Sequence, residues 1–479
     1  MISAIIGLYS WRYPSNVIYM LQSCEYQVLP YLRWYWRTTN FSSVAHRRSL
    51  QPTRPARLLL LAMRLGMLAE IAWGLLLLWR WWQDGAAGDG AFGLAAIFAT
   101  PVVWAQLIVL PLLFGRWLII YPKNYILVRR SQQIFQAHKG IKIAVAGSYG
   151  KTTMKELLAT VLGTSKTIAV TPGNKNVSVS HAYFAQRLKG DEDIVIIEYG
   201  EGAPGDVARF AATTHPTHAV ITGIAPAHLD RYKTVEAAAK DIFSLSRFVK
   251  PNHVYVNEES SLARSYLHKR FERYSQHGAL GWSVDYIRND ISGISFQLKK
   301  NGVVMQLHSG LLGRHQIGPI ALSAALAYHF GVTTADIEDA VAQTKPFEHR
   351  MQPYLLQGAW IIDDTYNGNI EGVRVGTELL KELPAKRKIY VTPGLVDQGA
   401  GTKEVHETMG RYIAAAKPDI TVLMKNSVTG FIRSGLDAAG YTGQVTIEDD
   451  PLSFYTNLSL FVAAGDLVLM QNDWPDNYA

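Results

Sequence analysis

The sequence has almost no cysteine, and its first 140 residues have little acidic charge. A single cysteine among 479 residues, Cys24, excludes an internal disulfide framework and a cysteine-based zinc cluster, which suits a reducing compartment. Residues 1–140 hold 4 Asp and Glu against 14 Lys and Arg, whereas residues 141–479 hold 35 against 33. The formal net charge of +8 therefore comes from one end of the chain. A hydrophobic content of 48% excludes a wholly disordered chain.

The basic end contains two long apolar stretches. Residues 58–82 form the first, and residues 91–114, which have no charged side chain, form the second. Each is long enough to cross about 30 Å of hydrocarbon as an α-helix. Gly and Asp residues between them indicate a turn, so the pattern predicts a transmembrane helical hairpin over residues 58–121. A helical pair that lies in the membrane interface is the alternative.

Positive charge predicts the orientation of this hairpin. Arginines and lysines flank it on both sides, while the turn has only Asp84 and Asp89. The positive-inside rule then places both termini, and with them the domains that follow the hairpin, in the cytoplasm, as in a multi-pass protein of the cell membrane. Residues 1–57 are interpreted as a basic amphipathic segment, with a surface-lying part at residues 17–36 that is broken at Pro30. Because 9 of the 12 tryptophans lie in the first 140 residues, a membrane is expected as the partner, and nucleic acid is not.

From about residue 141, short apolar runs alternate with stretches of helical periodicity. This alternation predicts an α/β fold whose sheet is mainly parallel and covered on both faces. A more antiparallel-looking insertion occupies residues 291–310. We place a central domain with a P-loop-type sheet at residues 138–346, and a C-terminal Rossmann-like α/β domain at residues 347–479.

A phosphate-loop motif directly follows the first predicted strand and opens a helix, and it consists of Gly147, Ser148, Tyr149, Gly150, Lys151, Thr152 and Thr153. Glycines let the backbone approach a phosphate, the helix N-terminus favours an anion, Lys151 adds positive charge, and a threonine hydroxyl can bind Mg²⁺. The full Walker spacing would require a glycine where Val145 stands. The motif predicts a nucleotide-phosphate site.

Polar residues also follow the next three predicted strands. Asn174 lies in TPGNKN after the second strand, Glu198 ends the third, and His228 lies in APAHLD after the fourth. Because the carboxyl ends of parallel strands meet at one crevice, these side chains are expected to converge. A carboxylate and an imidazole beside phosphates suit the coordination of Mg²⁺.

In this order the motifs resemble those of the Mur ligases, ATP-dependent amide-forming enzymes of peptidoglycan synthesis, and most closely the branch that adds D-alanyl-D-alanine. The resemblance covers about 340 residues, from residue 140 to the end. The matching segments are GSYGKTT, TPGNKN, IIEYGEG, APAHLD, LLGRHQIGPIALSAAL (residues 311–326), FEHRMQ with Arg350, and IIDDTYNGN (residues 361–369).

The resemblance implies that ATP phosphorylates a substrate carboxylate and that an amine then attacks the acyl phosphate. ATP and Mg²⁺ are the implied cofactors. Lys151, His228 and Arg350 are the implied catalytic residues, and Thr152, Glu198 and His228 are the implied metal ligands. The implied nucleotide-binding residues are Gly147, Ser148, Gly150, Lys151, Thr152, Thr153 and Asn174 in the central domain and Asp364 and Asn367 in the last domain, which together with Arg350 would reach ATP across the cleft.

The sequence departs from the family pattern at the second metal site. The family usually has a carbamylated lysine that bridges magnesium ions, and Ile242 stands at the aligned position, two residues beyond Lys240. Lys240 could serve from a shifted helix, Asp241 could supply the carboxylate directly, or the second metal site could be weakened. The remaining interpretation is that Lys240 is a solvated residue of the helix.

Three further departures concern other segments. Ile370 replaces the usual proline after the YNxN motif, and Pro319 stands near the place of an expected asparagine. The family's N-terminal UDP-binding domain is not matched, and the predicted hairpin takes its place.

These observations predict a membrane-anchored, ATP-dependent ligase that forms an amide or peptide bond in peptidoglycan precursor synthesis. Its expected partners are a cell-wall precursor, UDP-linked or lipid-linked, and an amino acid or dipeptide acceptor. The alternatives are a poly-γ-glutamate synthase-like ligase and a non-catalytic nucleotide-binding membrane scaffold.

Overall fold

A computed structural model describes residues 7–24, 26–38, 41, 50–173, 175–226, 229–366, 368–396 and 398–472. The chain divides into two compact units, Met1–Ile126 and Leu127–Ala479.

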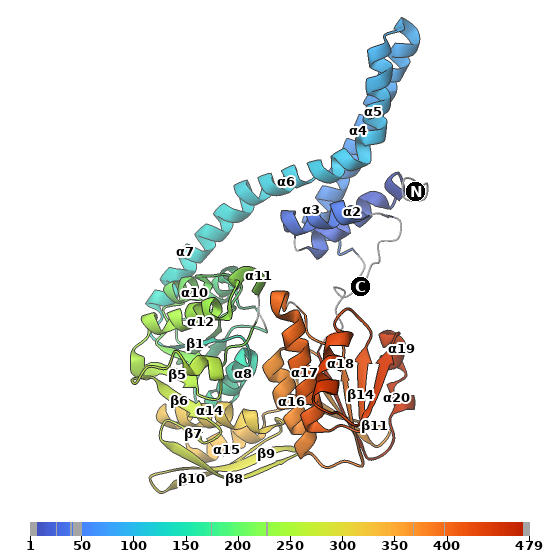
Figure 1. Ribbon diagram of the computed structural model, residues 1–479. Helices are drawn as coiled ribbons and strands as arrows, with labels where there is room; N and C mark the ends of the chain where they lie inside the picture. Colours follow the sequence, from blue (N-terminus) through green and yellow to red (C-terminus); the bar gives the residue numbers. More distant parts are fainter. Residues whose placement is uncertain are drawn as a thin grey trace. The chain divides into compact units, whose positions relative to one another are not determined.

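The first unit is built on a helical hairpin. Its helices α4 (Arg54–Asp84) and α5 (Ala87–Leu107) lie side by side (Figure 1). Gly85 ends α4 in the left-handed conformation, with φ 67°, which a residue without a side chain adopts at little cost. The two helices approach closely, because a Cβ atom added to Gly93 would lie 2.7 Å from the carbonyl oxygen of Gly74. Helix α5 is followed by α6 (Val109–Gly115), a π-helical turn (Arg116–Ile120) and α7 (Tyr121–Ala137).

Two helical segments are long and apolar enough to cross a membrane, judged by length and composition. They are Arg54–Asp84 and the continuous stretch Ala87–Ala137, and only 17% and 33% of their most apolar windows are buried. The helical hairpin is thus present where the sequence predicts it, and most of its apolar surface faces outward. The exposed side chains include Leu65, Leu68, Trp73, Leu75, Trp79, Phe92, Leu94 and Phe98.

The segment at residues 17–36 breaks earlier than predicted. It forms two helices, α2 (Tyr13–Ser23) and α3 (Val28–Arg37), and the break falls before Pro30, which is accommodated in the first turn of α3. The segment is packed against the hairpin. The Tyr13 hydroxyl donates to the carbonyl oxygen of Pro101 at 2.8 Å, and the Tyr31 hydroxyl donates to that of Ala105 at 2.7 Å. Both tyrosines are fully buried, so these hydrogen bonds join α2 and α3 to the hairpin, and the position of this segment on a membrane surface stays a prediction.

The second unit contains a ten-stranded sheet with the order β10-β9-β8-β7-β6-β5-β4-β1-β3-β2. Strands β1 to β6 pair in parallel, as predicted, and β7 to β10 pair in antiparallel fashion. The antiparallel part contains the predicted insertion but begins earlier, at β7. The strands are β1 (Ile141–Ala146), β2 (Ile168–Val170), β3 (Ile194–Glu198), β4 (His218–Ile221), β5 (Val254–Asn257), β6 (Glu272–Ser275), β7 (Gly278–Ala279), β8 (Trp282–Asp290), β9 (Gly293–Lys300) and β10 (Val303–Ser309).

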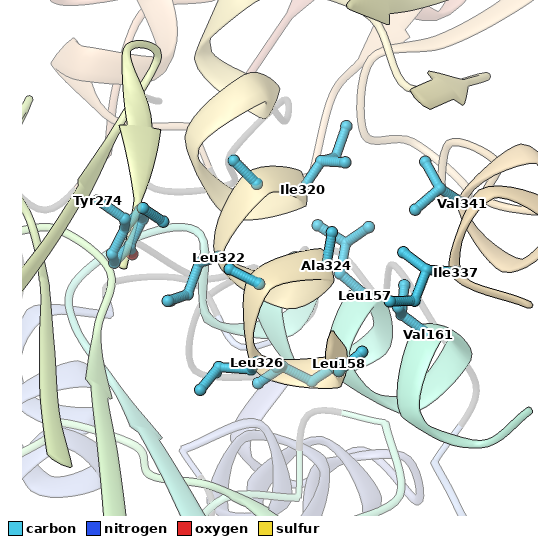
Figure 2. Packing of buried hydrophobic residues seen from close by; sticks show 14 of the residues in the cluster. Leu157, Leu158, Val161, Tyr274, Ile320, Leu322, Ala324, Leu326, Ile337 and Val341 are labelled. Atoms are coloured by element: carbon cyan, nitrogen blue, oxygen red, sulfur yellow. The ribbon is translucent and has the colours of Figure 1, made fainter. Parts of the chain in front are cut away.

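Helices form apolar layers with this sheet. One buried cluster joins α8, α14 and α15 to strands of the sheet, and Figure 2 shows Leu157 and Val161 of α8 beside Ile337 of α15. A second cluster includes residues of α9, α10 and α12 and Phe135 of α7. The helices are α8 (Lys151–Leu162), α9 (Ser178–Ala185), α10 (Asp206–Thr214), α11 (Leu229–Tyr232), α12 (Val235–Phe243), α13 (Ser261–Arg264), α14 (Ile317–His329) and α15 (Thr334–Ala342).

A six-stranded sheet with the order β11-β12-β16-β13-β14-β15 follows in the chain. Only β11 is antiparallel to its neighbour, which agrees with the predicted Rossmann-like fold. The strands are β11 (Gln352–Leu356), β12 (Ala359–Asp364), β13 (Arg387–Thr392), β14 (Ile420–Met424), β15 (Gln444–Glu448) and β16 (Asp466–Gln471). The helices are α16 (Ile370–Glu382), α17 (Thr402–Ala416), α18 (Thr429–Ala438), α19 (Pro451–Thr456) and α20 (Leu458–Phe461).

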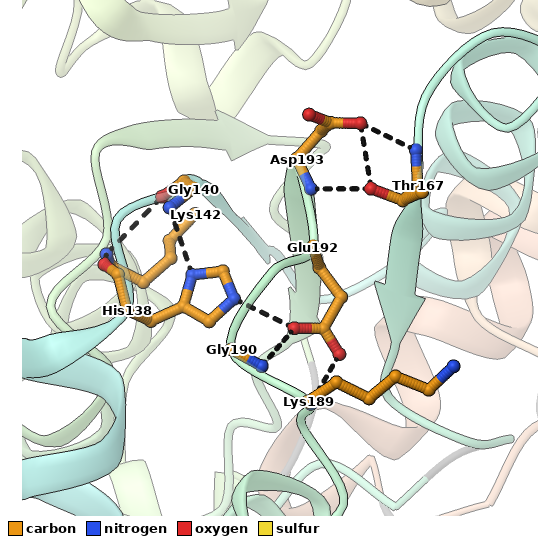
Figure 3. A network of polar contacts seen from close by, with 8 residues as sticks. All are labelled: His138, Gly140, Lys142, Thr167, Lys189, Gly190, Glu192 and Asp193. Atoms are coloured by element: carbon orange, nitrogen blue, oxygen red, sulfur yellow. Dashed lines mark hydrogen bonds and ion pairs between the residues drawn. The ribbon is translucent and has the colours of Figure 1, made fainter.

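A polar network fixes the end of α7 to the sheet (Figure 3). The backbone N–H of Gly140 donates to Nδ1 of His138 at 3.1 Å, so Nε2 carries the proton and donates to Glu192 at 3.0 Å. The Glu192 carboxylate also accepts the backbone N–H groups of Lys189 and Gly190, at 2.8 and 2.9 Å. Burial by itself would raise the pKa of Glu192, but these hydrogen bonds lower it to about 2.

We expect Glu192→Gln to destabilise the protein by about 1 kcal/mol at pH 7, since its hydrogen bonds lose their charged acceptor. A carboxyl group whose folded pKa is lowered contributes stability above its unfolded pKa and loses it as the pH falls through the folded value. The difference in apparent Tm between wild type and variant should therefore shrink between about pH 4.5 and pH 2. Thermal unfolding across this range measures it, with Asp191→Asn, an exposed neighbour, as the control. A difference that is independent of pH would contradict the assignment.

Candidate functional site

The phosphate-loop motif connects β1 to α8, as predicted. Its glycines are required by the backbone, since Gly147 has φ 149° and Gly150 has φ 75°. A Cβ atom on Gly147 would lie 2.2 Å from Oγ1 of Thr222. The backbone N–H of Ser148 donates to the carbonyl oxygen of Gly223 at 2.7 Å. The loop is therefore held against the chain that follows β4, and α8 begins at Lys151.

The strand register brings the ends of β1, β3 and β4 together. Val145 of β1 pairs with Glu198 of β3 on one side and with Val220 of β4 on the other. Val145, which stands where the full Walker spacing has glycine, is a fully buried strand residue. Glu198 consequently lies at the same edge as the phosphate loop, where the sequence pattern predicts it.

Two lysines of α8 face two glutamates at this edge. Nζ of Lys151 donates to Glu201 Oε2 at 2.8 Å and also to the carbonyl oxygen of Gly147. Nζ of Lys155, one turn later, lies 3.4 Å from Glu198 Oε2. Lys155 is fully buried, and its ammonium group also donates to two carbonyl oxygens of the segment after β2. The sequence interpretation missed Lys155 and Glu201, although Lys155 follows Lys151 at the i+4 spacing that shares a helix face.

The oxygen atoms at this edge suit Mg²⁺. Glu198 is 2% exposed; its Oε1 accepts Nδ2 of Asn176 at 3.2 Å, whereas its Oε2 accepts no hydrogen bond. The hydroxyl of Ser148 is also buried without a hydrogen-bond partner, and Thr152 is half-buried in the first turn of α8. Hydroxyl and carboxylate oxygens are the ligands that Mg²⁺ prefers, so these residues fit the ion. Within the described ranges, no group of three or more His, Cys, Asp or Glu side chains is placed to hold a metal.

Three predicted site residues, Asn174, His228 and Asn367, lie outside the described residues. Thr153 is half-buried in the first turn of α8, beside Thr152.

Asp241 and Lys240 occupy different environments on α12. Asp241 is buried, and its carboxylate accepts the backbone N–H of Gly205 and the hydroxyl of Tyr232, both at 2.8 Å. Burial raises the pKa of Asp241. It thus holds the N-terminal end of α10, while the side chain of Lys240 is exposed. In this structure neither residue faces the phosphate loop through a described contact.

In the C-terminal domain, Arg350 and Asp364 lie close to each other. The Arg350 guanidinium stacks on the ring of Tyr366, 4.5 Å from its centre. Asp364 accepts Nε2 of Gln471 at 2.7 Å and the backbone N–H of Met351 at 3.2 Å. Burial raises the pKa of Asp364 to about 7, although these hydrogen bonds and the charge of Arg350 lower it. This carboxyl group can therefore hold or release a proton near neutral pH.

Helix α16 of the same domain is tied to the central domain by Glu382. Its carboxylate accepts Nε of Arg314 at 2.9 Å and Nδ2 of Asn289 at 3.0 Å. Arg314 belongs to the LLGRHQ segment that carries part of the family resemblance.

Comparisons with known proteins agree with these features. Residues 145–327 match the family model of the Mur ligase middle domain. The chain is 27% identical over 291 residues to the UDP-N-acetylmuramoyl-tripeptide–D-alanyl-D-alanine ligase of Escherichia coli, covering 58% of this chain and 63% of that one. It therefore spans less than two thirds of that relative. The ligase of the same name from Mycobacterium leprae is 25% identical over 365 residues, 69% of this chain and 70% of that one.

Solved structures give the same fold. The MurF ligase of Thermotoga maritima in complex with ADP superimposes with a TM-score of 0.63 at 22% identity, covering 73% of this chain and 80% of that one. MurF of Acinetobacter baumannii gives 0.63 at 20% identity, covering 73% and 77%. The second unit thus has the Mur ligase fold, and residues 145–327 within it match the Mur ligase middle domain.

We expect Lys155→Met to lower the stability of the central domain by about 3 kcal/mol, because removal of one partner leaves the buried charge of Glu198 uncompensated. The double variant Lys155→Met, Glu198→Gln should recover part of this loss. Denaturant unfolding of the two single variants and the double variant measures the coupling. Strictly additive losses would show that the two side chains do not form an energetically significant pair.

Proposed function

We propose that this chain, whose core has the Mur ligase fold, is an ATP-dependent ligase that joins a carboxylate to an amine in peptidoglycan precursor synthesis. The observation that carries the proposal is the phosphate loop. The loop lies between β1 and α8, and its glycines are required by the backbone. With Lys151 at the start of the helix, it offers the backbone N–H groups and the positive charge that bind the phosphates of a nucleoside triphosphate. Glu198 and the hydroxyl of Thr152 at the same edge support it.

The proposed reaction has two steps. A carboxylate oxygen of the acyl substrate attacks the γ-phosphorus of ATP, and ADP leaves. The amine nitrogen of the acceptor then attacks the acyl carbon, the bond from that carbon to the phosphate oxygen breaks, and the nitrogen loses a proton. Such transfers depend mainly on positioning and on neutralisation of charge.

We assign roles to this chain's residues accordingly. Lys151 binds the β- and γ-phosphates, and the backbone of Gly147, Ser148 and Gly150 follows the phosphate chain. Arg350 and Asp364 contact the nucleotide from the C-terminal domain, so closure of that domain is part of catalysis. Thr152 and Glu198, with His228 as the sequence predicts, would hold Mg²⁺, which neutralises phosphate charge when bound.

We propose D-alanyl-D-alanine as the acceptor and a muramoyl peptide as the acyl substrate, because the ligases named above carry these groups in their names. The hairpin of α4 and α5 supports a membrane anchor, since its outward face is apolar and its flanks are rich in arginine. With the catalytic core in the cytoplasm next to the membrane, a lipid-linked or otherwise membrane-proximal precursor is the substrate that the arrangement favours.

Phosphate release by the full chain in liposomes tests the activity. Free and lipid-linked muramoyl peptides are offered with D-alanyl-D-alanine, single amino acids or glutamate, and we expect release to require an acyl substrate and D-alanyl-D-alanine together. Lys151→Ala should lower the rate by about 10²-fold or more, because a charge that stabilises the transferred phosphate is lost. Lys250→Ala, an exposed position of the central domain, is the matched control.

The other outcomes of this experiment would indicate a different function or a different substrate. Release that requires glutamate alone as acceptor would replace the proposal by a poly-γ-glutamate synthase-like reaction. No substrate-dependent release from any pair would favour the nucleotide-binding scaffold. Full activity on a soluble UDP-muramoyl peptide after deletion of residues 1–137 would contradict the lipid-linked substrate.

The membrane topology can be tested with single cysteines, because Cys24 is the only cysteine of the chain. In a Cys24→Ser background, Gly88→Cys at the start of α5, next to the turn, should react with an impermeant maleimide in cells whose outer face is accessible. A Cβ atom at Gly88 meets no atom within 4 Å, so the substitution is tolerated. Lys250→Cys should react only after the membrane is opened. The reverse pattern, or equal labelling of both, would contradict the topology.

A further inference from the structure

The segment that follows α5 has an exposed apolar surface. Five large side chains of α6, the π-helical turn and the start of α7 are 45% to 70% exposed, namely Leu110, Leu113, Phe114, Trp117 and Tyr121. Each stands three, four or seven residues from another member, which places them along one side of the helical segment. We call these five residues the α6–α7 stripe. A shallow hollow along the stripe is lined only by apolar and aromatic side chains.

The chain bends between α5 and the α6–α7 stripe. Helix α5 ends at Leu107, and α6 begins at Val109. Pro111 has no N–H group to donate to the carbonyl oxygen of Leu107, and the loss of such a bond bends a helix. Figure 1 shows α6 turned away from the direction of α4 and α5. The 21 residues of α5 rise by about 30 Å, which is enough to cross the hydrocarbon of a bilayer, so the stripe begins where the chain leaves it.

The charge near the stripe is of one sign. Residues 90–140 contain five Lys and Arg and no Asp or Glu, and the side chain of Lys123 in α7 is exposed. The positive-inside rule places this end of the hairpin at the cytoplasmic leaflet, which carries the anionic lipids that attract such segments. Trp117 and Tyr121 are of the two residue types that are enriched at the boundary between membrane and water.

The apolar surface is widest at the π-helical turn. Leu118, Ile119 and Ile120, which stand beside the stripe, are 45% to 66% exposed. Contiguous apolar surface of this kind marks an interaction site. A lipid surface is favoured over another protein, because the stripe follows directly on a helix that is itself long and apolar enough to cross a membrane. The cations around it complement a negative surface.

We propose that the α6–α7 stripe lies in the head-group region of an anionic membrane surface, with its apolar side chains at the boundary of the hydrocarbon. This inference rests on the proposed function, because it presumes that the hairpin anchors the chain. It adds a membrane contact of a different kind. Helices α4 and α5 cross the hydrocarbon, whereas α6 and the start of α7 lie along its boundary, and their contact depends on the charge of the lipid.

A pair of single cysteines tests the position of the stripe in the full chain. In a Cys24→Ser background, Tyr121→Cys carries a fluorescent label on the stripe, and Lys123→Cys carries it about half a turn round the same helix. The vesicles contain phosphatidylcholine, phosphatidylglycerol and a lipid whose spin label near the head group quenches the fluorescence. Quenching should be about threefold stronger for Tyr121→Cys, because the apolar face of an interfacial helix lies about 5–10 Å deep and the other face does not.

The composition of the vesicles tests the choice of an anionic surface. Quenching for Tyr121→Cys should be weaker in vesicles of phosphatidylcholine alone. With phosphatidylglycerol present it should fall as the ionic strength is raised, because salt screens the attraction between cations and head groups. Equal quenching under all these conditions would overturn the anionic partner. Thermal unfolding of each labelled variant, compared with Cys24→Ser, establishes that it is folded.

The inference and the proposed function fail in different ways. Phe98→Cys places the label on an exposed position of α5, where a spin label deep in the acyl chain should quench it. If it does not, the membrane anchor itself is wrong. If Phe98→Cys is quenched and Tyr121→Cys is not, only the contact of the stripe is wrong, and a label there that is shielded from water would indicate a protein as the occupant. Equally deep quenching for Tyr121→Cys and Lys123→Cys would also overturn the inference, since the segment would then cross the membrane.

Discussion

The register of three parallel strands is the constraint on which the rest of the site depends. Val145 pairs with both Glu198 and Val220, so β1, β3 and β4 end at one level. The loops that follow them must then share one small volume. Gly147 can lie against Thr222 only because it has no side chain, and the close packing aims the start of α8 at this edge.

Two lysine–glutamate pairs then shape the electrostatics of this edge. Lys155 and Glu198 are almost wholly buried, and the lysine is tied to backbone carbonyl groups, so this pair belongs to the folded core. Lys151, which pairs with Glu201, stands one turn nearer to the start of α8, and its side chain is 13% exposed.

Much of this arrangement could be predicted from the sequence, because apolar runs ending in glycine mark β1 and its loop, and a charge-free stretch marks α5. Pairings between residues that are distant in the sequence could not be predicted. Nothing near Glu201 indicates that it meets Lys151, and Asp241 has no local signal for its role at α10. Strand β8 was missed because Asp285, Arg288 and Asp290 interrupt its apolar pattern around a bulge. The packing of α2 and α3 on the hairpin likewise depends on tyrosines whose partners lie over 70 residues away.

The central claim is that a carboxylate is activated by phosphoryl transfer before the amide forms. It is tested most directly with a muramoyl-peptide substrate whose reacting carboxylate is labelled with ¹⁸O, by mass spectrometry of the phosphate released in the presence of ATP and D-alanyl-D-alanine. Because the bond between the acyl carbon and the phosphate oxygen breaks, the account predicts that a carboxylate oxygen appears in the phosphate. Amide product accompanied by unlabelled phosphate would contradict it.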